Sequence, residues 1–245
     1  MVDGVGWITL NRPEKRNAIS DEMFAALSSL TDGWAGDDEV RVVVIRGAGD
    51  QAFASGADMG ELDSSTAGSP PPGARKGFSL QINKPLIAMV HGFCIGGGLM
   101  VAMEADIRIA SDDAVFAIPA GPLGAGYPLV GVQRLVALVG PAHASTIMFT
   151  GDRFDARRAL ELGLVNEVVP RSELEARVTA LASRIAANAP LSLAAAKAVI
   201  NATIGTPGAT FGDAQALIDA CWESEDFREG RRAFAEKRTP GFRGR

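Results

Sequence analysis

The sequence has little of what disulfides and metal sites require. Its 245 residues include only two cysteines and two histidines. Cys94 and Cys221 lie far apart in apolar surroundings and no Cys-x-x-Cys pair occurs, so we expect buried, reduced thiols and neither a disulfide nor a zinc site. With only His91 and His143 available, a histidine-rich metal site is nearly excluded. The sequence predicts a protein without a bound metal.

Several common ligand and membrane signatures are also missing. The chain has no Gly-Lys dipeptide for a P-loop, no complete G-x-G-x-x-G spacing and no G-x-S-x-G elbow. The apolar segment PLIAMV is far shorter than the roughly 18 residues that a membrane span requires, and the N-terminus lacks a signal-peptide pattern. A net charge of −5 offers no general attraction to nucleic acid or anionic lipid. We therefore expect a cytoplasmic protein with neither partner.

Strands and helices mix in the first part of the chain, and helices dominate the rest. Segments rich in β-branched residues predict strands at 5–10, 40–47, 84–90, 106–111 and 114–119. Helices are predicted at 21–34, 155–162, 171–187, 191–204, 211–224 and 225–237. Gly163 is expected at the C-terminal cap of the second helix, with a short strand after it. The Ser-, Gly- and Pro-rich stretch between Leu62 and Gly77 predicts a mobile loop. We expect one core over 1–190 and a helical region over 191–245.

The stretch GFCIGGGLM places three glycines, Gly96 to Gly98, directly before what reads as a helix. Glycines at such a turn let the backbone approach a ligand closely, and the free N–H groups and dipole of the helix start favour negative charge. Taken alone, a glycine run is better explained as a tight packing turn between a strand and a helix. A second motif, SGAD at 55–58, favours a functional role.

Five segments in sequence order resemble the crotonase superfamily, which includes enoyl-CoA hydratases and isomerases. They are LNRPEKRNAIS, AFASGADMGEL, KPLIAMVHGFCIGGG, FTGDRFDARRALELGLVNEVV and FREGRRAFAEKRTPGFRGR. The resemblance implies an α/β fold, a spiral of ββα units with a C-terminal helical region that builds homotrimers, often paired into hexamers. It also implies acyl-CoA thioester substrates, with CoA as part of the substrate and no separate cofactor. Members hold a thioester enolate with two backbone N–H groups, which the motifs assign to Ala57 and Gly97.

The resemblance further implies a CoA-binding surface. Basic residues near both ends of the chain would meet the phosphates, although charges on a helix are usually only a solvated face. The SGAD segment would line the adenine pocket, and a phenylalanine near the C-terminus packs by the adenine in the family, sometimes from a neighbouring subunit. The residues expected to contact CoA are Arg12, Lys15, Arg16, Ser55, Asp58, Met59, Phe234 and Lys237.

The two glutamates that hydratases of this superfamily use are absent. At the corresponding positions, three residues after Gly97 and just after an F-x-x-P segment, the chain has Met100 and Ala120. A positioned general acid or base contributes roughly 10²–10⁴ in rate, so hydration is expected to fall by at least that factor. Met100 and Ala120 would instead form an apolar wall of the substrate site. Glu104, a turn beyond Met100, is expected to lie too far along the helix to replace them.

Tyr127, the only tyrosine, falls a few residues after the second missing acid. The surrounding LGAGYPLVGVQRL resembles the methylmalonyl-CoA decarboxylases of the superfamily, which have an active-site tyrosine here but a histidine at the position of Ala57. Tyr127 is therefore a candidate catalytic residue, with an ordinary buried tyrosine as the alternative. His91 and Asp106 are expected to be structural. Three functions stay open: a lyase or isomerase of the enoyl-CoA hydratase/isomerase family with non-standard chemistry, a decarboxylase-like lyase, and a non-catalytic acyl-CoA-binding protein.

Overall fold

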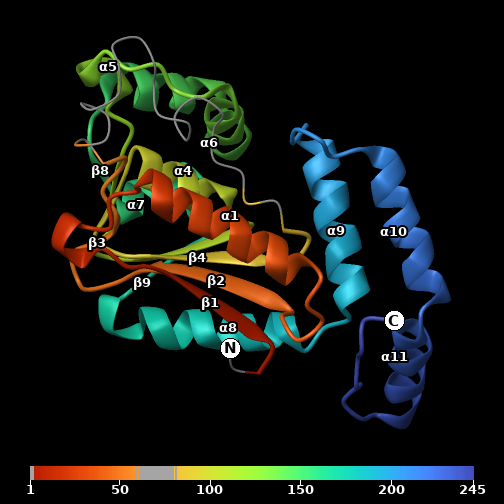
Figure 1. The fold of residues 1–245 in the computed structure, drawn as a ribbon. Coiled ribbons are helices and arrows are strands. Elements are labelled where there is room, and N and C mark those ends of the chain that lie inside the picture. Colours follow the sequence, from red (N-terminus) through yellow and green to blue (C-terminus); the bar gives the residue numbers. More distant parts are fainter. Residues whose placement is uncertain (1–2, 59, 61–79, 81) are drawn as a thin grey trace.

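The computed structural model describes residues 3–58, 60, 80 and 82–245 (Figure 1). Met59 and the segment from Leu62 to Gly77, expected to be a mobile loop, lie outside the described residues. The described part forms two sheets, helices around them, and three C-terminal helices that extend to one side (Figure 1).

A five-stranded parallel sheet forms the centre of the fold. The third strand in this sheet is buried along its whole length, as expected for a parallel sheet that is covered on both faces. The strands in spatial order are β1 (Val5–Leu10), β2 (Val42–Gly47), β4 (Leu86–Val90), β6 (Ile107–Ser111) and β9 (Glu167–Val169). The first four confirm predicted strands, and β9 is the short strand expected after Gly163.

A smaller four-stranded sheet is formed by segments that follow the central strands. Its strands in spatial order are β3 (Ala52–Ala54), β5 (Phe93–Ile95), β7 (Val115–Ala117) and β8 (Phe154–Asp155). The chain passes from β4 to β5 and then into a helix, and from β6 to β7 and then into a helix, which produces the expected ββα units. The strand predicted at 114–119 is confirmed in β7. The sequence does not predict β3 and β5, because each is short and runs directly into a glycine-containing turn, at Gly56 and Gly96.

Helices cover both faces of the central sheet (Figure 1). Val42 and Val44 of β2 pack toward α8, whereas Val43 and Ile45 face a larger cluster that includes residues of α1, α4 and α6. This alternation follows from the two-residue period of a strand. The helices of this part are α1 (Asp21–Ala35), α4 (Gly97–Glu104), α5 (Ala120–Leu123), α6 (Leu129–Thr150), α7 (Ala156–Glu161) and α8 (Leu174–Ala186), with short 3₁₀ turns at Pro13–Lys15 and Arg171–Glu173. The helices predicted at 21–34, 155–162 and 171–187 are confirmed.

The sequence does not predict α6, which has 22 residues. Its apolar pattern is interrupted at the Gly140–Pro141 pair, where Gly140 has a φ of 74° and a ψ of 164° and the helix breaks into two segments. Gly163, by contrast, has a φ of 78° directly after the end of α7, which confirms its predicted place at a helix terminus.

Three C-terminal helices form a separate layer, which confirms the predicted helical segments after residue 190 (Figure 1). The side chain of Lys197 donates to the carboxylate of Asp106 at 2.8 Å, and the N–H of Leu86 donates to the same oxygen at 2.7 Å. Asp106 thus joins this layer to the amino ends of β4 and β6. The three helices are α9 (Pro190–Thr203), α10 (Phe211–Glu223) and α11 (Glu225–Glu236).

The predicted burial of the thiol is confirmed for Cys94 and is wrong for Cys221. Cys94 is fully buried, whereas Cys221 is only partly buried because it lines an open cavity of about 560 Å³ among the C-terminal helices. Among the described residues no group of three His, Cys, Asp or Glu side chains is placed to hold a metal ion. No single described helix is long and apolar enough to cross a membrane, and the pair 171–186 and 190–203 reaches that length only across a bend of 106°.

Candidate active site

The first part of the candidate site is the segment that follows β3. It pairs with Ile19, whose N–H donates to the carbonyl oxygen of Gly56 at 2.8 Å and whose carbonyl oxygen accepts from the N–H of Asp58 at 3.0 Å. Because the residues on either side of Ala57 make both bonds of this parallel bridge, the N–H of Ala57 points away from Ile19. It has no hydrogen-bond partner among the described residues.

The second part is the glycine run at the start of α4. Gly97 is the first residue of α4, so its N–H has no partner within the helix. A Cβ atom on Gly97 would lie 3.3 Å from the nitrogen of Ala57, so the two backbone N–H groups are close neighbours. A Cβ atom on Gly98 would lie 2.2 Å from the carbonyl oxygen of Ala54, so this glycine is required by the packing of α4 on β3. The run therefore allows the close packing of α4 and leaves the N–H of Gly97 without a partner inside the helix.

The peptide group between Gly96 and Gly97 is held on its carbonyl side. Its oxygen accepts a hydrogen bond from the N–H of Met100 at 3.0 Å and one from the hydroxyl of Tyr127 at 2.8 Å. Burial raises the pKa of Tyr127, so the hydroxyl stays protonated and donates. The structure thus places Tyr127 next to the predicted donor Gly97, with its proton directed at the backbone.

Apolar side chains stand at positions 100 and 120, where the resemblance leads us to expect the glutamates of a hydratase. Met100 on α4 and Ala120 at the start of α5 are both buried. A Cβ atom on Gly131 of α6 would lie 3.2 Å from the terminal methyl of Met100 and 3.1 Å from the Tyr127 ring, so these two side chains meet against α6. Met100 and the Tyr127 ring thus form one apolar surface between α4 and α6.

Glu104 is the one acidic residue of α4, and its carboxylate is bonded to the backbone of residue 80. It accepts a hydrogen bond from the N–H of Leu80 at 3.3 Å. Burial raises the pKa of Glu104, while the more distant Arg134 opposes this effect. The side chain is directed at residue 80 one turn beyond Met100, where it secures the backbone.

Five of the predicted CoA-contacting residues lie together beside Ala57. The carboxylate of Asp58 accepts from Lys15 at 2.9 Å and from Arg12 at 2.8 Å. These two cations and the N–H of Gly60 hold the pKa of Asp58 at about 2. Asp58 therefore fixes the preceding 3₁₀ turn against the SGAD segment, and the Lys15 side chain stays 52% exposed. Met59 lies outside the described residues.

Ser55 and Arg16 complete this group. The N–H of Ser55 donates to the carbonyl oxygen of Arg16 at 3.0 Å, and the guanidinium of Arg16 lies 5.5 Å from the ring centre of Phe93. Arg153 lies 5.6 Å from the same ring. Sequence reasoning missed Arg153, because it is brought to Arg16 only by the pairing of β5, β7 and β8.

Asn17 is a second residue that sequence reasoning missed. It is fully buried with a φ of 56°, and its amide donates to the carbonyl oxygens of Ala48 and Ala52 at 2.9 and 2.8 Å. Its side-chain oxygen accepts from the N–H of Arg12 at 3.0 Å. Asparagine tolerates the left-handed region better than most residues, and this was the available signal. Asn17 locks the basic turn in place.

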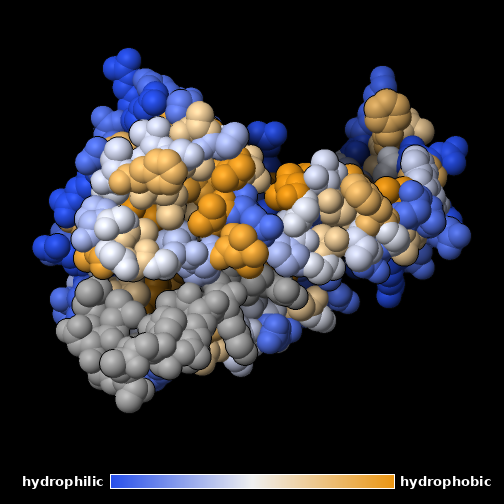
Figure 2. Space-filling view, turned by 90° about the horizontal axis from the view of Figure 1, so that it is seen from above, coloured by the Kyte–Doolittle hydropathy of each residue, from blue (hydrophilic) through white to orange (hydrophobic). Residues whose placement is uncertain are grey.

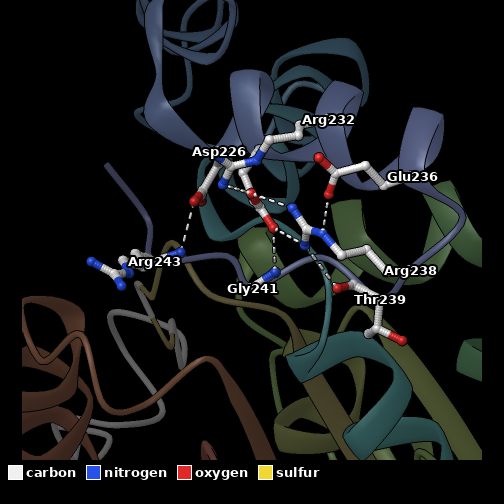
Figure 3. Close-up of polar contacts among 8 residues, drawn as sticks. Asp226, Arg232, Glu236, Arg238, Thr239, Gly241 and Arg243 are labelled. Atoms are coloured by element: carbon white, nitrogen blue, oxygen red, sulfur yellow. Dashed lines mark hydrogen bonds and ion pairs between the residues drawn. The ribbon is translucent and has the colours of Figure 1, made fainter.

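Phe234 and Lys237 are not brought to the site within one chain. Phe234 on α11 and Lys237 directly after this helix are both exposed. The segment after the helix is held against it by Glu229, whose carboxylate binds Arg238 at 2.5 and 3.0 Å, Arg232, and the N–H of Gly241 (Figure 3). Arg41 donates to the carbonyl oxygen of Phe242 at 2.8 Å. Arg41 lies just before the amino end of β2, whereas Ala57 lies past the carboxyl end of that strand, after β3. Helix α11 is therefore at the opposite end of the sheet from Ala57 (Figure 1).

His91 is buried directly after β4, and its Nε2 has no hydrogen-bond partner among the described residues. Burial and the nearby Arg171 lower its pKa, so the imidazole is neutral near pH 7. It lines a separate cavity of about 390 Å³ with Arg46 and Arg171, to which none of the predicted site residues contributes.

The whole chain, residues 1–245, matches the family Enoyl-CoA hydratase/isomerase. It is 36% identical over 246 residues to the "Probable enoyl-CoA hydratase, mitochondrial" of Dictyostelium discoideum, covering 96% of this chain and 86% of that protein. It is 37% identical over 250 residues to the carnitinyl-CoA dehydratase of Salmonella typhi, covering 97% of this chain and 94% of that protein.

Solved structures agree with these sequence matches. An enoyl-CoA hydratase from Mycobacterium tuberculosis superimposes with a TM-score of 0.89 at 32% identity, covering 100% of this chain and 97% of the other. An enoyl-CoA hydratase from Bacillus anthracis gives a TM-score of 0.87 at 30% identity, covering 99% and 96%. The likeness extends over both sheets and the C-terminal helices, as the resemblance of the five segments implies. The chain belongs to the enoyl-CoA hydratase/isomerase family of the crotonase superfamily.

Proposed function

We propose that this chain binds an acyl-CoA thioester with its oxygen between the N–H groups of Ala57 and Gly97, which stabilise the enolate that forms there. The observation that carries the proposal is the close approach of these two N–H groups at the start of α4. Donors fixed at the place where negative charge develops stabilise the transition state, and the helix dipole adds to their effect. One such donor is worth about 10²–10³ in turnover.

The reaction that we propose differs from ordinary hydration. Adding water to a double bond requires groups that orient and deprotonate the water, and neither Met100 nor Ala120 can do this. Glu104 offers no substitute, since its carboxylate is bonded to Leu80. We therefore assign the chain a non-standard lyase or isomerase reaction on a CoA thioester, in which the enolate is stabilised by the backbone donors.

A decarboxylase-like lyase is the alternative that the apolar wall favours. In a malonyl-type thioester the bond between the α-carbon and the carboxylate breaks, CO₂ leaves, and the bonding electron pair becomes the thioester enolate. A proton from water then restores the carbon. This reaction needs no general base, and an apolar wall around Met100 disfavours the charged carboxylate of the substrate. A non-catalytic acyl-CoA-binding protein would keep the two donors and perform no reaction.

For CoA we propose the surface formed by Lys15, Arg16, Ser55 and Asp58, together with Met59 as the next residue in the sequence. Phe234 and Lys237 would then come from a neighbouring copy in a homotrimer or a dimer of trimers. Exposed apolar side chains support such contacts: they gather over α5, α6 and α9 (Figure 2) and include Leu123, Leu129, Phe149, Ile200 and Ile204. CoA belongs to the substrate, so we propose no separate cofactor. We also propose that the protein has no nucleic-acid or membrane partner and a cytoplasmic location.

Binding and turnover of a panel of CoA thioesters test this function. Calorimetry with acetyl-CoA is expected to show binding, and absent heat together with an absent thermal shift would refute the acyl-CoA proposal. Release of CO₂ from malonyl-CoA or methylmalonyl-CoA supports the decarboxylase-like alternative. Fast water addition to crotonyl-CoA contradicts the altered chemistry, and binding without any turnover identifies a non-catalytic protein. Light scattering after gel filtration measures the oligomeric state.

A further inference from the structure

Tyr127 contacts the peptide group that carries the candidate oxyanion donor. Its hydroxyl donates to the carbonyl oxygen of Gly96 at 2.8 Å, and the N–H of Gly97 belongs to the same peptide plane, on the opposite side of the C–N bond. The tyrosine is therefore bonded to one end of an amide whose other end faces the thioester in the proposed function. This geometry differs from that of an acid aimed at the substrate.

Hydrogen bonding to a carbonyl oxygen draws electron density through the amide and makes its N–H a stronger donor. Chains of such bonds strengthen one another by about 10–30% per bond. The Gly96 oxygen already accepts from the N–H of Met100 at 3.0 Å, so the hydroxyl of Tyr127 fills its second acceptor position. The peptide is then polarised from two directions.

The same contact restrains the orientation of the peptide. Gly96 has a φ of 51° and a ψ of −116°, and it is followed by a second glycine, so no Cβ atom opposes rotation of the plane between them. A rotated plane would turn the Gly97 N–H away from Ala57. The tyrosine ring is itself held against Gly131 and the methyl of Met100, so its hydroxyl is a fixed point for the Gly96 oxygen.

We propose that Tyr127 is a positioning residue that orients and polarises the Gly96–Gly97 peptide and so strengthens one of the two donors to the thioester oxygen. This inference rests on the proposed function of that peptide. It assigns the tyrosine an action through the backbone, where the resemblance to decarboxylases implies direct contact with substrate. The buried hydroxyl, whose pKa is raised, keeps the proton that this action needs.

The expected loss of turnover distinguishes a positioning role of the Tyr127 hydroxyl from direct proton transfer to the substrate. A backbone donor to an oxyanion is worth about 10²–10³ in turnover. If Tyr127 contributes roughly 10–30% of that donor's effect on a logarithmic scale, its hydroxyl is worth about two- to eightfold. A hydroxyl that transfers a proton to the substrate would be worth roughly 10²–10⁴. The Tyr127→Phe variant is thus expected to lose two- to eightfold in kcat with little change in KM.

Two spectroscopic readouts report the peptide itself. In the free protein, loss of the bond to the Gly96 oxygen is expected to move the ¹⁵N resonance of Gly97 upfield in Tyr127→Phe. With acetyl-CoA labelled at the thioester carbonyl, the infrared stretching frequency of the bound carbonyl is expected to be higher in the variant than in the natural protein. Val139→Ala, a packing change in the core of α6, is the control and is expected to move neither.

The single tyrosine allows a graded test that does not depend on the phenylalanine variant folding. Growth on ring-fluorinated tyrosine replaces position 127 alone and makes the hydroxyl a stronger donor. The bound carbonyl frequency is expected to fall further below that of the natural protein, and the Gly97 ¹⁵N resonance to move downfield. A role in packing alone would not follow the acidity of the phenol.

Unchanged Gly97 and carbonyl signals across both substitutions would overturn the inference, as would a loss of turnover beyond tenfold with an unchanged Gly97 resonance. Failure of the proposed function is distinguishable, because it is an absence of acetyl-CoA binding to the natural protein. In that case the Gly97 resonance of the free protein still decides whether Tyr127 polarises the peptide.

Discussion

Replacing Gly98 by alanine is the sharpest test of how the candidate site is assembled. In an exposed helix interior, alanine is more favourable than glycine by about 0.8–1 kcal/mol. At Gly98, however, the added Cβ would lie 2.2 Å from the carbonyl oxygen and 2.7 Å from the Cβ of Ala54. Because non-bonded carbon atoms prefer separations of about 3.5–4.0 Å, α4 and β3 must move apart by roughly 1 Å. The expected loss is about 1–3 kcal/mol in the free energy of unfolding.

The displacement should also separate the two backbone donors, since Ala54 leads into the segment of Ala57 and Gly98 follows Gly97. A misplacement of about 1 Å can reduce turnover by roughly 10². Urea denaturation followed by circular dichroism measures the stability, and calorimetry with acetyl-CoA measures the binding. Gly33→Ala is the matched control: nothing lies within 4 Å of its added Cβ, and it is expected to stabilise the protein by about 0.5–1 kcal/mol. If Gly98→Ala were as stable as Gly33→Ala and bound acetyl-CoA normally, the described contact between α4 and β3 would be refuted.

Three further predictions concern carboxylates. The natural protein should hydrate crotonyl-CoA at least about 10²-fold more slowly than a family hydratase, and the double variant Met100→Glu with Ala120→Glu should recover part of the rate. The rate is measured as the loss of enoyl absorbance. An ordinary hydration rate in the natural protein would contradict this prediction. Asp58 has a folded-state pKa of about 2 against an ordinary 3.8, so its ion pairs stabilise the fold above about pH 4 and are lost as pH falls toward 2. Asp58→Asn should therefore lower the melting temperature at pH 7, with a difference that shrinks below pH 4; a constant difference would argue against it. For Glu104 the pH dependence has the opposite sign, because burial raises its pKa above 4.5 and stability is lost as pH rises. Glu104→Gln should therefore be more stable than the natural protein at pH 7, and thermal melts should show that this advantage is gone below pH 4.5.

Elements whose own residues show a clear apolar run or a clear helical period were predictable from the sequence. The apolar run from Leu86 to Val90 is a buried central strand, and the helices after residue 170 carry a regular apolar face. α6 was not predictable, because Gly140 and Pro141 interrupt its pattern and only packing against the core, through Leu135 and Val139, holds its two segments in place. Here tertiary contacts outweigh local propensity.

Within the site, the sequence motifs led to Ala57 and Gly97, and the structure brings these residues together. The motifs could not indicate the hydrogen bonds and ion pairs between side chains that lie far apart in sequence. Asp58 is bonded to Arg12 and Lys15 only because the chain before α1 folds back on the SGAD segment. The contact of Tyr127 with Gly96 spans 31 residues and follows no repeat. Such pairings depend on the whole topology.

The two proposed donors, the N–H groups of Ala57 and Gly97, belong to the main chain and not to any side chain. Every amino acid except proline brings its own N–H, so exchanges of the surrounding side chains leave the donors chemically intact. In the proposed function, exchanges at Met100 and Ala120 can therefore change the reaction while both backbone donors to the thioester stay in place. For laboratory evolution, a library at positions 100 and 120 would vary the chemistry while the proposed backbone donors stay the same.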